Sequence, residues 1–137
     1  MGRFAVAVKI ANNDDLAQVR LGLLEPAKVR QLTIDGVVDS GAARLVLPQK
    51  IAEQLGLPHA GKVKVQYADG RRAIRNKVKE VYLEIMGRDG TFSAIVEPKR
   101  RTALIGAIVL EELDYLVDCT HHRLVPRDPR YVVSEIE

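Results

Sequence analysis

The residue types that could do chemistry gather within residues 34–48. An apolar run in this stretch leads into one carboxylate, Asp39, which is followed by Ser40, Gly41 and Ala42. A carboxylate placed beside a second carboxylate shares one proton with it and activates a water held between the two. The Ser40 hydroxyl can hydrogen-bond to a neighbouring loop, Gly41 lets two backbones approach closely, and Ala42 leaves room for a substrate. The pattern therefore predicts a loop that carries carboxylate chemistry.

Asp-Ser-Gly is also an ordinary turn sequence, because Asp and Ser bond to nearby backbone and Gly adopts positive φ. Two features favour a functional loop. The strand before Asp39 is strongly apolar, and the chain returns at once to an apolar run at residues 45–47, which is unusual after a hairpin turn. The second feature is another motif further along the chain, Leu104-Ile105-Gly106.

Together the two motifs resemble those of the retropepsin-like family, the retroviral aspartic proteases with their cellular and bacterial relatives. In that family a hydrophobic-hydrophobic-Gly element passes behind the catalytic loop and opens a short helix. The Leu-Glu-Glu-Leu of residues 110–113 and the Leu-Val-Asp of residues 116–118 are similar to the helix and closing strand of the bacterial and cellular branch. The resemblance covers roughly residues 30–126.

The resemblance implies an all-β, retropepsin-like acid-protease barrel with one or two short helices, formed by residues 1–137 as a single domain. It also implies an aspartic endopeptidase in which Asp39 is catalytic and Ser40 and Gly41 hold the catalytic pair of carboxylates. Leu104, Ile105 and Gly106 would support the catalytic loop. No metal or other cofactor is needed for this chemistry.

The chain carries a single Asp-Ser-Gly, and one carboxylate cannot form a pair. The resemblance therefore implies a homodimer in which Asp39 faces Asp39 of a second copy across a two-fold axis. The expected partners are a second copy and a peptide or protein substrate. The alternative is a non-catalytic peptide-binding or dimerisation module of the same fold.

Residues 62–78 predict a β-hairpin, because an Asp-Gly pair separates two alternating runs. In the retropepsin-like family a glycine-bearing hairpin at this place folds over the substrate as a flap. Its tip would consist of Tyr67, Ala68, Asp69 and Gly70, which together with Ala42 would border the substrate groove. The alternative is an ordinary hairpin with no role as a lid.

The sequence departs from the retroviral pattern at two positions. Ala43 stands where those proteases carry an Asp, and Ala107 stands where they carry an Arg. In the retroviral pattern these two residues would pair, so the absence of both is self-consistent. The departures bear on substrate-backbone contacts and on helix anchoring, and they leave the Asp39 pair untouched.

A cluster of possible metal ligands or nucleophiles follows residue 118. Cys119, His121 and His122 lie close together, but a structural zinc site needs four ligands and only His59 remains elsewhere as a histidine. Cys119 could act as a nucleophile, yet nothing in the sequence orients a base beside it. We therefore predict a turn after the preceding strand.

Composition sets the remaining limits. The 137 residues suffice for one domain, and scarce aromatics with no Trp indicate a core of Val, Leu, Ile and Ala. A net charge of +3 is too weak to indicate nucleic-acid binding, and the basic runs 71–72 and 99–101 are interpreted as solvated loop positions. A single cysteine indicates a reducing compartment, and no leader or membrane-spanning stretch is recognised, so we expect a cytoplasmic protein.

Period-two alternation dominates the rest of the chain and predicts strands connected by short turns. A turn is expected at residues 12–15 and another at 87–90. A helix is expected from Pro48 to Gly56, with Ile51, Ala52 and Leu55 on its apolar face. The predicted strands are residues 4–10, 16–24, 29–38 (kinked at 35–36), 62–67, 71–78, 81–86 and 91–96.

Overall fold

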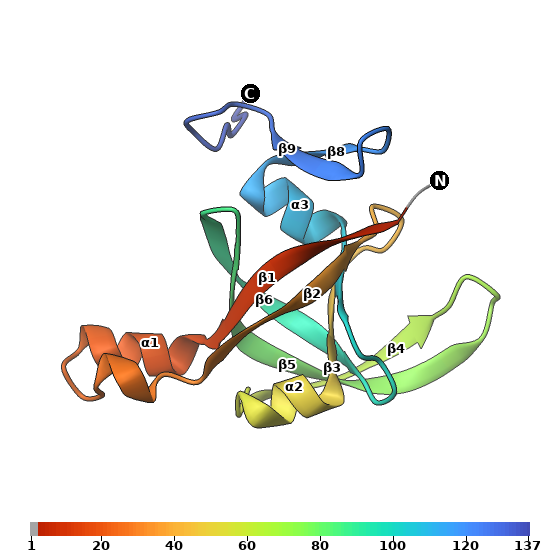
Figure 1. The fold of residues 1–137 in the computed structure, drawn as a ribbon. Coiled ribbons are helices and arrows are strands. Elements are labelled where there is room, and N and C mark those ends of the chain that lie inside the picture. Colours follow the sequence, from red (N-terminus) through yellow and green to blue (C-terminus); the bar gives the residue numbers. More distant parts are fainter. Residues whose placement is uncertain (1–2) are drawn as a thin grey trace.

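The structure is a computed structural model that describes residues 3–137 (Figure 1). It contains one seven-stranded sheet and one two-stranded sheet, with short helices between the strands. In chain order the elements are β1 (Phe4–Asn12), α1 (Asn13–Arg20), the 3₁₀ helix η1 (Pro26–Lys28), β2 (Gln31–Val38), β3 (Leu45–Pro48), α2 (Gln49–Gln54), β4 (His59–Gln66), β5 (Arg72–Ile85), β6 (Arg88–Glu97), β7 (Ala103–Ile105), α3 (Ala107–Leu113), β8 (Tyr115–Asp118) and β9 (Arg123–Pro126).

The larger sheet closes into a barrel. Its strand order is β1-β2-β7-β3-β6-β5-β4, and β1 pairs with β5 as well as with β2. The ring therefore contains every strand of this sheet except β4, which pairs with β5 and projects from the barrel (Figure 1). The predicted all-β barrel with a few short helices is confirmed.

The core fills the barrel and continues under α3. Period-two burial places one side of each strand inside, as in β5, where Val81, Leu83 and Ile85 are buried and alternate with half-buried residues. No Trp contributes, and branched aliphatic side chains dominate, as composition predicted. The largest fully buried apolar side chains are Val8, Ile10, Leu45, Leu47, Leu55, Val81, Leu83, Ile85, Ile105, Val109 and Leu113.

The predicted strand over residues 16–24 is wrong, because this segment belongs largely to helix α1. The expected turn at residues 12–15 is the start of that helix: the Asn12 side chain accepts a hydrogen bond from the Asp15 amide at 3.0 Å. Asp15 in turn accepts from the Arg30 backbone at 3.0 Å and from its guanidinium at 2.9 Å. An Asn cap followed by acidic residues is a helix-start signal, and here it outweighs the irregular apolar spacing that followed.

Two finer predictions about strands also need correction. The kink expected at residues 35–36 is absent, because β2 pairs in unbroken register with β1 through Gly36. Gly36 serves close packing instead, since a β-carbon there would lie 2.6 Å from Val8 Cγ2. Residues 71–78 and 81–86 form one strand, β5, whose irregularity lies at Glu80 with φ +60°.

The remaining sequence-based elements agree with the structure. Helix α2 follows Pro48 and is succeeded by Gly56 at φ +60°. The β4–β5 hairpin, the β7–α3 junction and the β8 strand lie where the motifs predicted them. Residues 119–122 form the turn of the β8–β9 hairpin, which lies beside α3 at the C-terminal end of the chain (Figure 1). The turn expected at 87–90 is shorter, because β6 begins at Arg88.

Candidate active site

Asp39 occupies a fixed position at the end of β2. Its amide donates to the Ile105 carbonyl at 3.0 Å, and its own carbonyl accepts from the Ala42 amide at 3.1 Å. The Gly41 amide donates to Asp39 Oδ1 at 3.0 Å. The second carboxylate oxygen, Oδ2, lies 3.4 Å from an Arg3 guanidinium nitrogen, and the Asp39 side chain is 20% exposed. The carboxylate is therefore held by backbone and still reached by solvent.

Strand β7 runs behind the Asp39 loop. It pairs in parallel with β2, which enters the loop, and in antiparallel with β3, which leaves it. A β-carbon at Gly106 would lie 2.3 Å from the Arg44 carbonyl oxygen and 2.8 Å from the Ala42 carbonyl oxygen, so only glycine fits. The structure therefore brings Leu104, Ile105 and Gly106 to the back of the loop, where the family motif expects them.

The first turn of α3 forms hydrogen bonds to the backbone of the same loop. The Ala107 amide donates to the Ala42 carbonyl at 2.8 Å, and the Ile108 amide donates to the Ala43 carbonyl at 3.0 Å. Main-chain groups provide both bonds, so the side chains of Ala43 and Ala107 are not needed for them. The departures from the retroviral pattern at Ala43 and Ala107 thus leave this backbone anchoring in place.

The other predicted residues of the loop differ in exposure. Ser40 and Gly41 are exposed, whereas Ala42 is half-buried. Ser40 also borders a hollow of about 770 Å³ that lies between α3, β8 and the C-terminal segment. The hydroxyl of Ser40 therefore lies at the surface beside Asp39.

The predicted flap is an arm that extends away from the barrel (Figure 1). Its tip is closed by local bonds: the Tyr67 amide donates to the Arg71 carbonyl at 2.8 Å, and the Gly70 amide donates to the Tyr67 carbonyl at 2.9 Å. Gly70 adopts φ +88°, which requires glycine for an unstrained turn. Ala68, Asp69 and Gly70 are exposed.

Tyr67 differs from the rest of the tip because it connects the arm to the barrel. Its hydroxyl donates to Glu97 Oε2 at 2.6 Å, and Arg75 Nε lies 2.5 Å from Glu97 Oε1. The hydrogen bond to Glu97, with burial second, raises the pKa of Tyr67, so the phenol stays protonated. The Arg71 guanidinium lies 4.8 Å from the centre of the Tyr67 ring.

A family model described as aspartyl protease matches residues 25–108 of this chain. The chain belongs to the aspartyl protease family. The matched segment contains the Asp39 loop, the flap arm and Gly106, so the family assignment covers the candidate site itself. A search of curated proteins finds no match.

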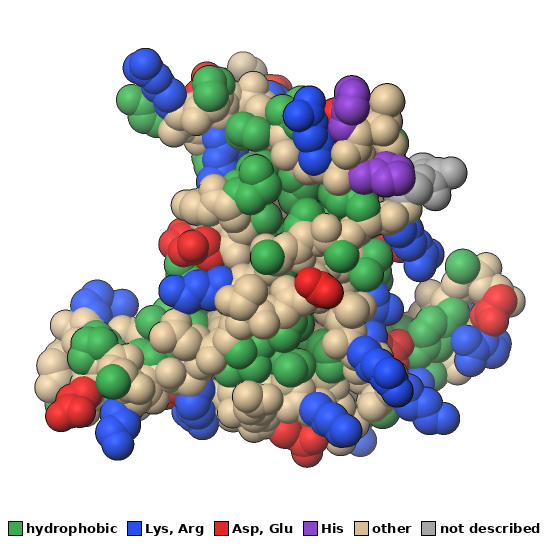
Figure 2. All heavy atoms as spheres, viewed as in Figure 1, with side chains coloured by type: hydrophobic (Ala, Val, Ile, Leu, Met, Phe, Trp, Pro, Cys, Tyr) green, Lys and Arg blue, Asp and Glu red, His purple; other side chains and the backbone are tan. Residues whose placement is uncertain are grey.

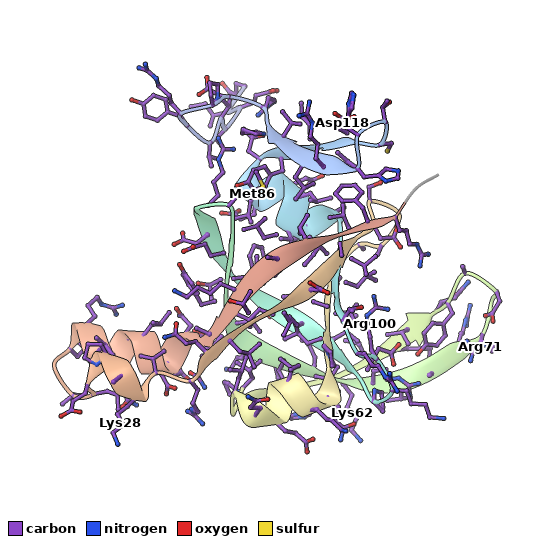
Figure 3. All side chains as sticks on the ribbon, viewed as in Figure 1. Lys28, Lys62, Arg71, Met86, Arg100 and Asp118 are labelled. Carbon is purple, nitrogen blue, oxygen red and sulfur yellow. The ribbon has the colours of Figure 1, made fainter. Side chains whose placement is uncertain are left out.

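Sequence reasoning missed a cavity that lies between the flap arm and the segment after β6. The cavity measures about 390 Å³. Basic side chains lie between the projecting arm and the barrel, with Arg100 on the barrel side and Arg71 on the arm (Figures 2 and 3). The sequence predicts that the run at residues 99–101 is solvated. Lys99 and Arg101 are exposed, whereas Arg100 is half-buried and donates to the Thr102 carbonyl at 2.8 Å. Only the fold shows that Lys99 and Arg100 face the flap arm.

The Cys-Thr-His-His segment has a simple structural role. Asp118 accepts hydrogen bonds from the Thr120 and His121 amides at 3.1 Å, and its other oxygen lies 2.9 Å from the His121 ring. The hydrogen bond from the His121 ring, followed by that from the His121 amide and by the Arg123 guanidinium, lowers the pKa of Asp118 to about 2. Within residues 3–137 no group of three or more His, Cys, Asp or Glu could hold a metal ion. In the same part of the chain, no helix is long and apolar enough to cross a membrane.

Proposed function

We propose that this aspartyl protease is a homodimeric aspartic endopeptidase, in which a water is activated between Asp39 and Asp39 of a second copy. One observation carries the proposal: a single Asp39 carboxylate is fixed at the end of β2, with β7 and Gly106 behind it. The chain has only one Asp-Ser-Gly loop, so the second carboxylate must come from another copy.

The chemistry follows from placing two like charges side by side. Such a pair holds one proton between its members, because both carboxylates cannot ionise easily at short range. The neutral member hydrogen-bonds the scissile carbonyl, and the ionised member takes a proton from the attacking water. In this proposal Ser40 bonds across to the partner loop and Gly41 allows the close approach. Ala42 and the flap tip, residues 67–70, border the substrate.

Apolar side chains beside the Asp39 loop support the second copy. Ile108 is 43% exposed and Leu116 is 54% exposed, although both are large and hydrophobic. Ile108 bonds to the loop through its amide, and Leu116 borders the same hollow as Ser40. An isologous contact across this face would bury both residues while bringing the two Asp39 side chains together.

A second candidate is a non-catalytic peptide-binding or dimerisation module of the same fold. The ion pair between Arg3 and Asp39 Oδ2 favours it, because a carboxylate that already has a cationic partner can serve in a structural contact. A binding module would not need the Asp39 carboxylate for turnover. The two candidates therefore differ in what a mixed dimer can do.

The test mixes wild-type chain with the Asp39→Asn variant and follows peptide hydrolysis. Random pairing should make an equal amount of variant reduce the wild-type rate to about one half, and a ninefold excess to about one tenth, because mixed dimers hold one Asp39. Added Asp14→Asn chain, which keeps Asp39 and changes an exposed Asp on α1, should not lower the rate. A rate unaffected by Asp39→Asn, or a chain that sediments as a monomer at every concentration with substrate present, would contradict the shared pair.

A further inference from the structure

The cavity under the flap is lined mainly by cations. Its lining includes Tyr67, Arg71 and Arg75 on the arm, with Glu97, Lys99 and Arg100 on the barrel side. Four of these six side chains carry a positive charge and one carries a negative charge. Figure 2 shows Lys and Arg side chains gathered over this part of the surface, between arm and barrel.

The one carboxylate in the lining is already occupied. Glu97 uses Oε1 for Arg75 and Oε2 for the Tyr67 hydroxyl, so its charge is matched within the arm-to-barrel contact. Arg71 pairs with Asp69 at 2.7 Å, outside the cavity lining. Among residues 3–137, Lys99 and Arg100 form no ion pair with any carboxylate. The positive charges of Lys99 and Arg100 are therefore not neutralised by an ion pair with any described residue.

Arg100 is the residue for which an added carboxylate would matter most. It is half-buried, and its guanidinium bonds to the Thr102 carbonyl rather than to an anion. Burial, followed by repulsion from Arg3, lowers the pKa of Arg100, although Glu97 and Asp39 act in the opposite direction. The attraction of an incoming carboxylate would offset the cost of burial and the repulsion from Arg3.

The position of the cavity ties it to the candidate active site. Arg3, which acts on Arg100, contacts Asp39 itself at 3.4 Å. The segment that carries Lys99 and Arg100 continues directly into β7 and Gly106 behind the Asp39 loop. Asp39 also acts electrostatically on Arg100, so a peptide lying between the flap tip and Asp39 would pass this cavity close to its scissile bond.

We infer that the cavity between the flap arm and Lys99-Arg100 is a subsite for acidic side chains, so the enzyme selects peptides with Asp or Glu near the scissile bond. The inference rests on the proposed endopeptidase function and adds a substrate class to it. In a two-fold dimer the subsite occurs twice, so acidic residues should be favoured on both sides of the cleaved bond.

The test compares peptides that are identical except for Glu, Gln or Lys scanned through the positions flanking the scissile bond. At low salt, kcat/KM for the best Glu peptide should exceed that for its Gln counterpart by about tenfold, and added salt should shrink the ratio. A peptide with Lys at the same position should have a lower kcat/KM than its Gln counterpart. Equal cleavage of Glu and Gln peptides at every position would overturn the inference while leaving the protease function intact.

Charge-reversal variants locate the preference. Lys99→Glu, which changes an exposed side chain, should reduce the Glu-to-Gln ratio several-fold, and Lys99→Glu with Arg100→Glu should bring it to one or below. The control is Arg20→Glu with Lys28→Glu, which makes the same charge change at exposed positions; Figure 3 shows Lys28 at the opposite end of the molecule from Arg71. A control that lowers the ratio as much as the Lys99 variants would overturn the assignment to this cavity.

Measuring peptide binding tests the acidic subsite independently of the proposed endopeptidase activity. The Asp39→Asn protein should bind a labelled Glu peptide more tightly than its Gln counterpart, measured by fluorescence anisotropy, whether or not wild type cleaves either. If no peptide is cleaved but this preference is present and lost in Lys99→Glu, the endopeptidase proposal fails and the acidic subsite stands. If binding shows no preference, the subsite is overturned.

Discussion

In the Asp39 loop and in the flap tip, an aspartate accepts a hydrogen bond from the amide two residues further on. Gly41 N lies 3.0 Å from Asp39 Oδ1, and Arg71 N lies 2.9 Å from Asp69 Oδ1. Both turns also contain a glycine. As local sequences the two are nearly equivalent, and each is an ordinary Asx turn.

The Asp39 loop and the flap tip differ in what packs behind each turn. Behind Asp39 lie β7, Gly106 and the first amides of α3, which bond to the loop carbonyls. Within residues 3–137, no second layer lies behind Asp69: β5 is the only strand that pairs with β4, and Tyr67 makes the contact with the barrel. The same kind of turn is therefore held in place in the Asp39 loop, where β7 packs behind it. At the flap tip no strand packs behind the turn among the described residues.

The largest difference should appear in catalysis. Asp39→Asn should lower kcat/KM for peptide hydrolysis by at least about 1,000-fold, because in the proposed mechanism it removes the group that accepts the proton from water. Asp69→Asn keeps an oxygen that can accept from the Arg71 amide and should cost less than about tenfold. Steady-state kinetics on folded protein, checked by circular dichroism, measures both. Full activity in Asp39→Asn would assign Asp39 a structural role.

Two glycine substitutions, one behind the Asp39 loop and one at the flap tip, compare the two regions by their free energy of unfolding. Gly106→Ala should cost about 3 kcal/mol or more in free energy of unfolding, because its β-carbon would meet the Arg44 carbonyl oxygen at 2.3 Å. Gly70→Ala meets nothing within 4 Å and loses only the ease of φ +88°, which costs about 1 kcal/mol. Urea unfolding gives both values. Equal losses would show that the loop relaxes around the added methyl group.

Much of this contrast was accessible from sequence. The Asp39 motif, the Leu104-Ile105-Gly106 motif and the Asp-Gly hairpin each predicted an element that the structure contains. Local turn chemistry and a two-motif pattern suffice for these, because both depend on nearby residues or on a fixed order along the chain.

The failures have different physical causes. Helix α1 was missed because its start depends on the Asn12 cap and on Asp15 bonding to Arg30, whereas the apolar spacing that follows is irregular. The cationic cavity was missed because Arg75 and Arg100 meet only when the arm folds beside the β6–β7 connection. Long-range placement of charged side chains leaves no periodic signal in the sequence.

Hydrogen exchange should resolve the two regions in dynamics. Amides in residues 66–72 should be at least about 100-fold less protected than the Asp39 and Ala107 amides, because the tip is exposed and its bonds are local. Binding of an uncleavable peptide analogue should raise protection at the tip and leave the Asp39 loop unchanged. Strong protection at the tip in the free protein, unaltered by the analogue, would identify a plain structural hairpin.

The smallest expected effect is a pH response confined to the flap tip. The Arg71 guanidinium, followed by the Arg71 amide, holds the pKa of Asp69 below its ordinary value of 3.8. Ionised Asp69 therefore orders the tip fully above pH 3.8, and this order is lost as pH falls through the lowered pKa. Asp69 is 58% exposed and Arg71 is 71% exposed, so solvent screens the pair and global stability should not change with it.

The Arg71 amide resonance reports this response directly. In an NMR titration it should shift on acidification below pH 3.8 in wild type, and it should stay nearly constant in Asp69→Asn, where no carboxylate titrates. The bonds from Asp39 N to Ile105 and from Ala107 N to Ala42 join uncharged backbone groups, so they should persist over the same window. If the Ala107 amide shifted together with the Arg71 amide, the tip and the Asp39 loop would be coupled. The flap tip would then not respond independently of the Asp39 loop, and the contrast drawn between the two turns would be wrong.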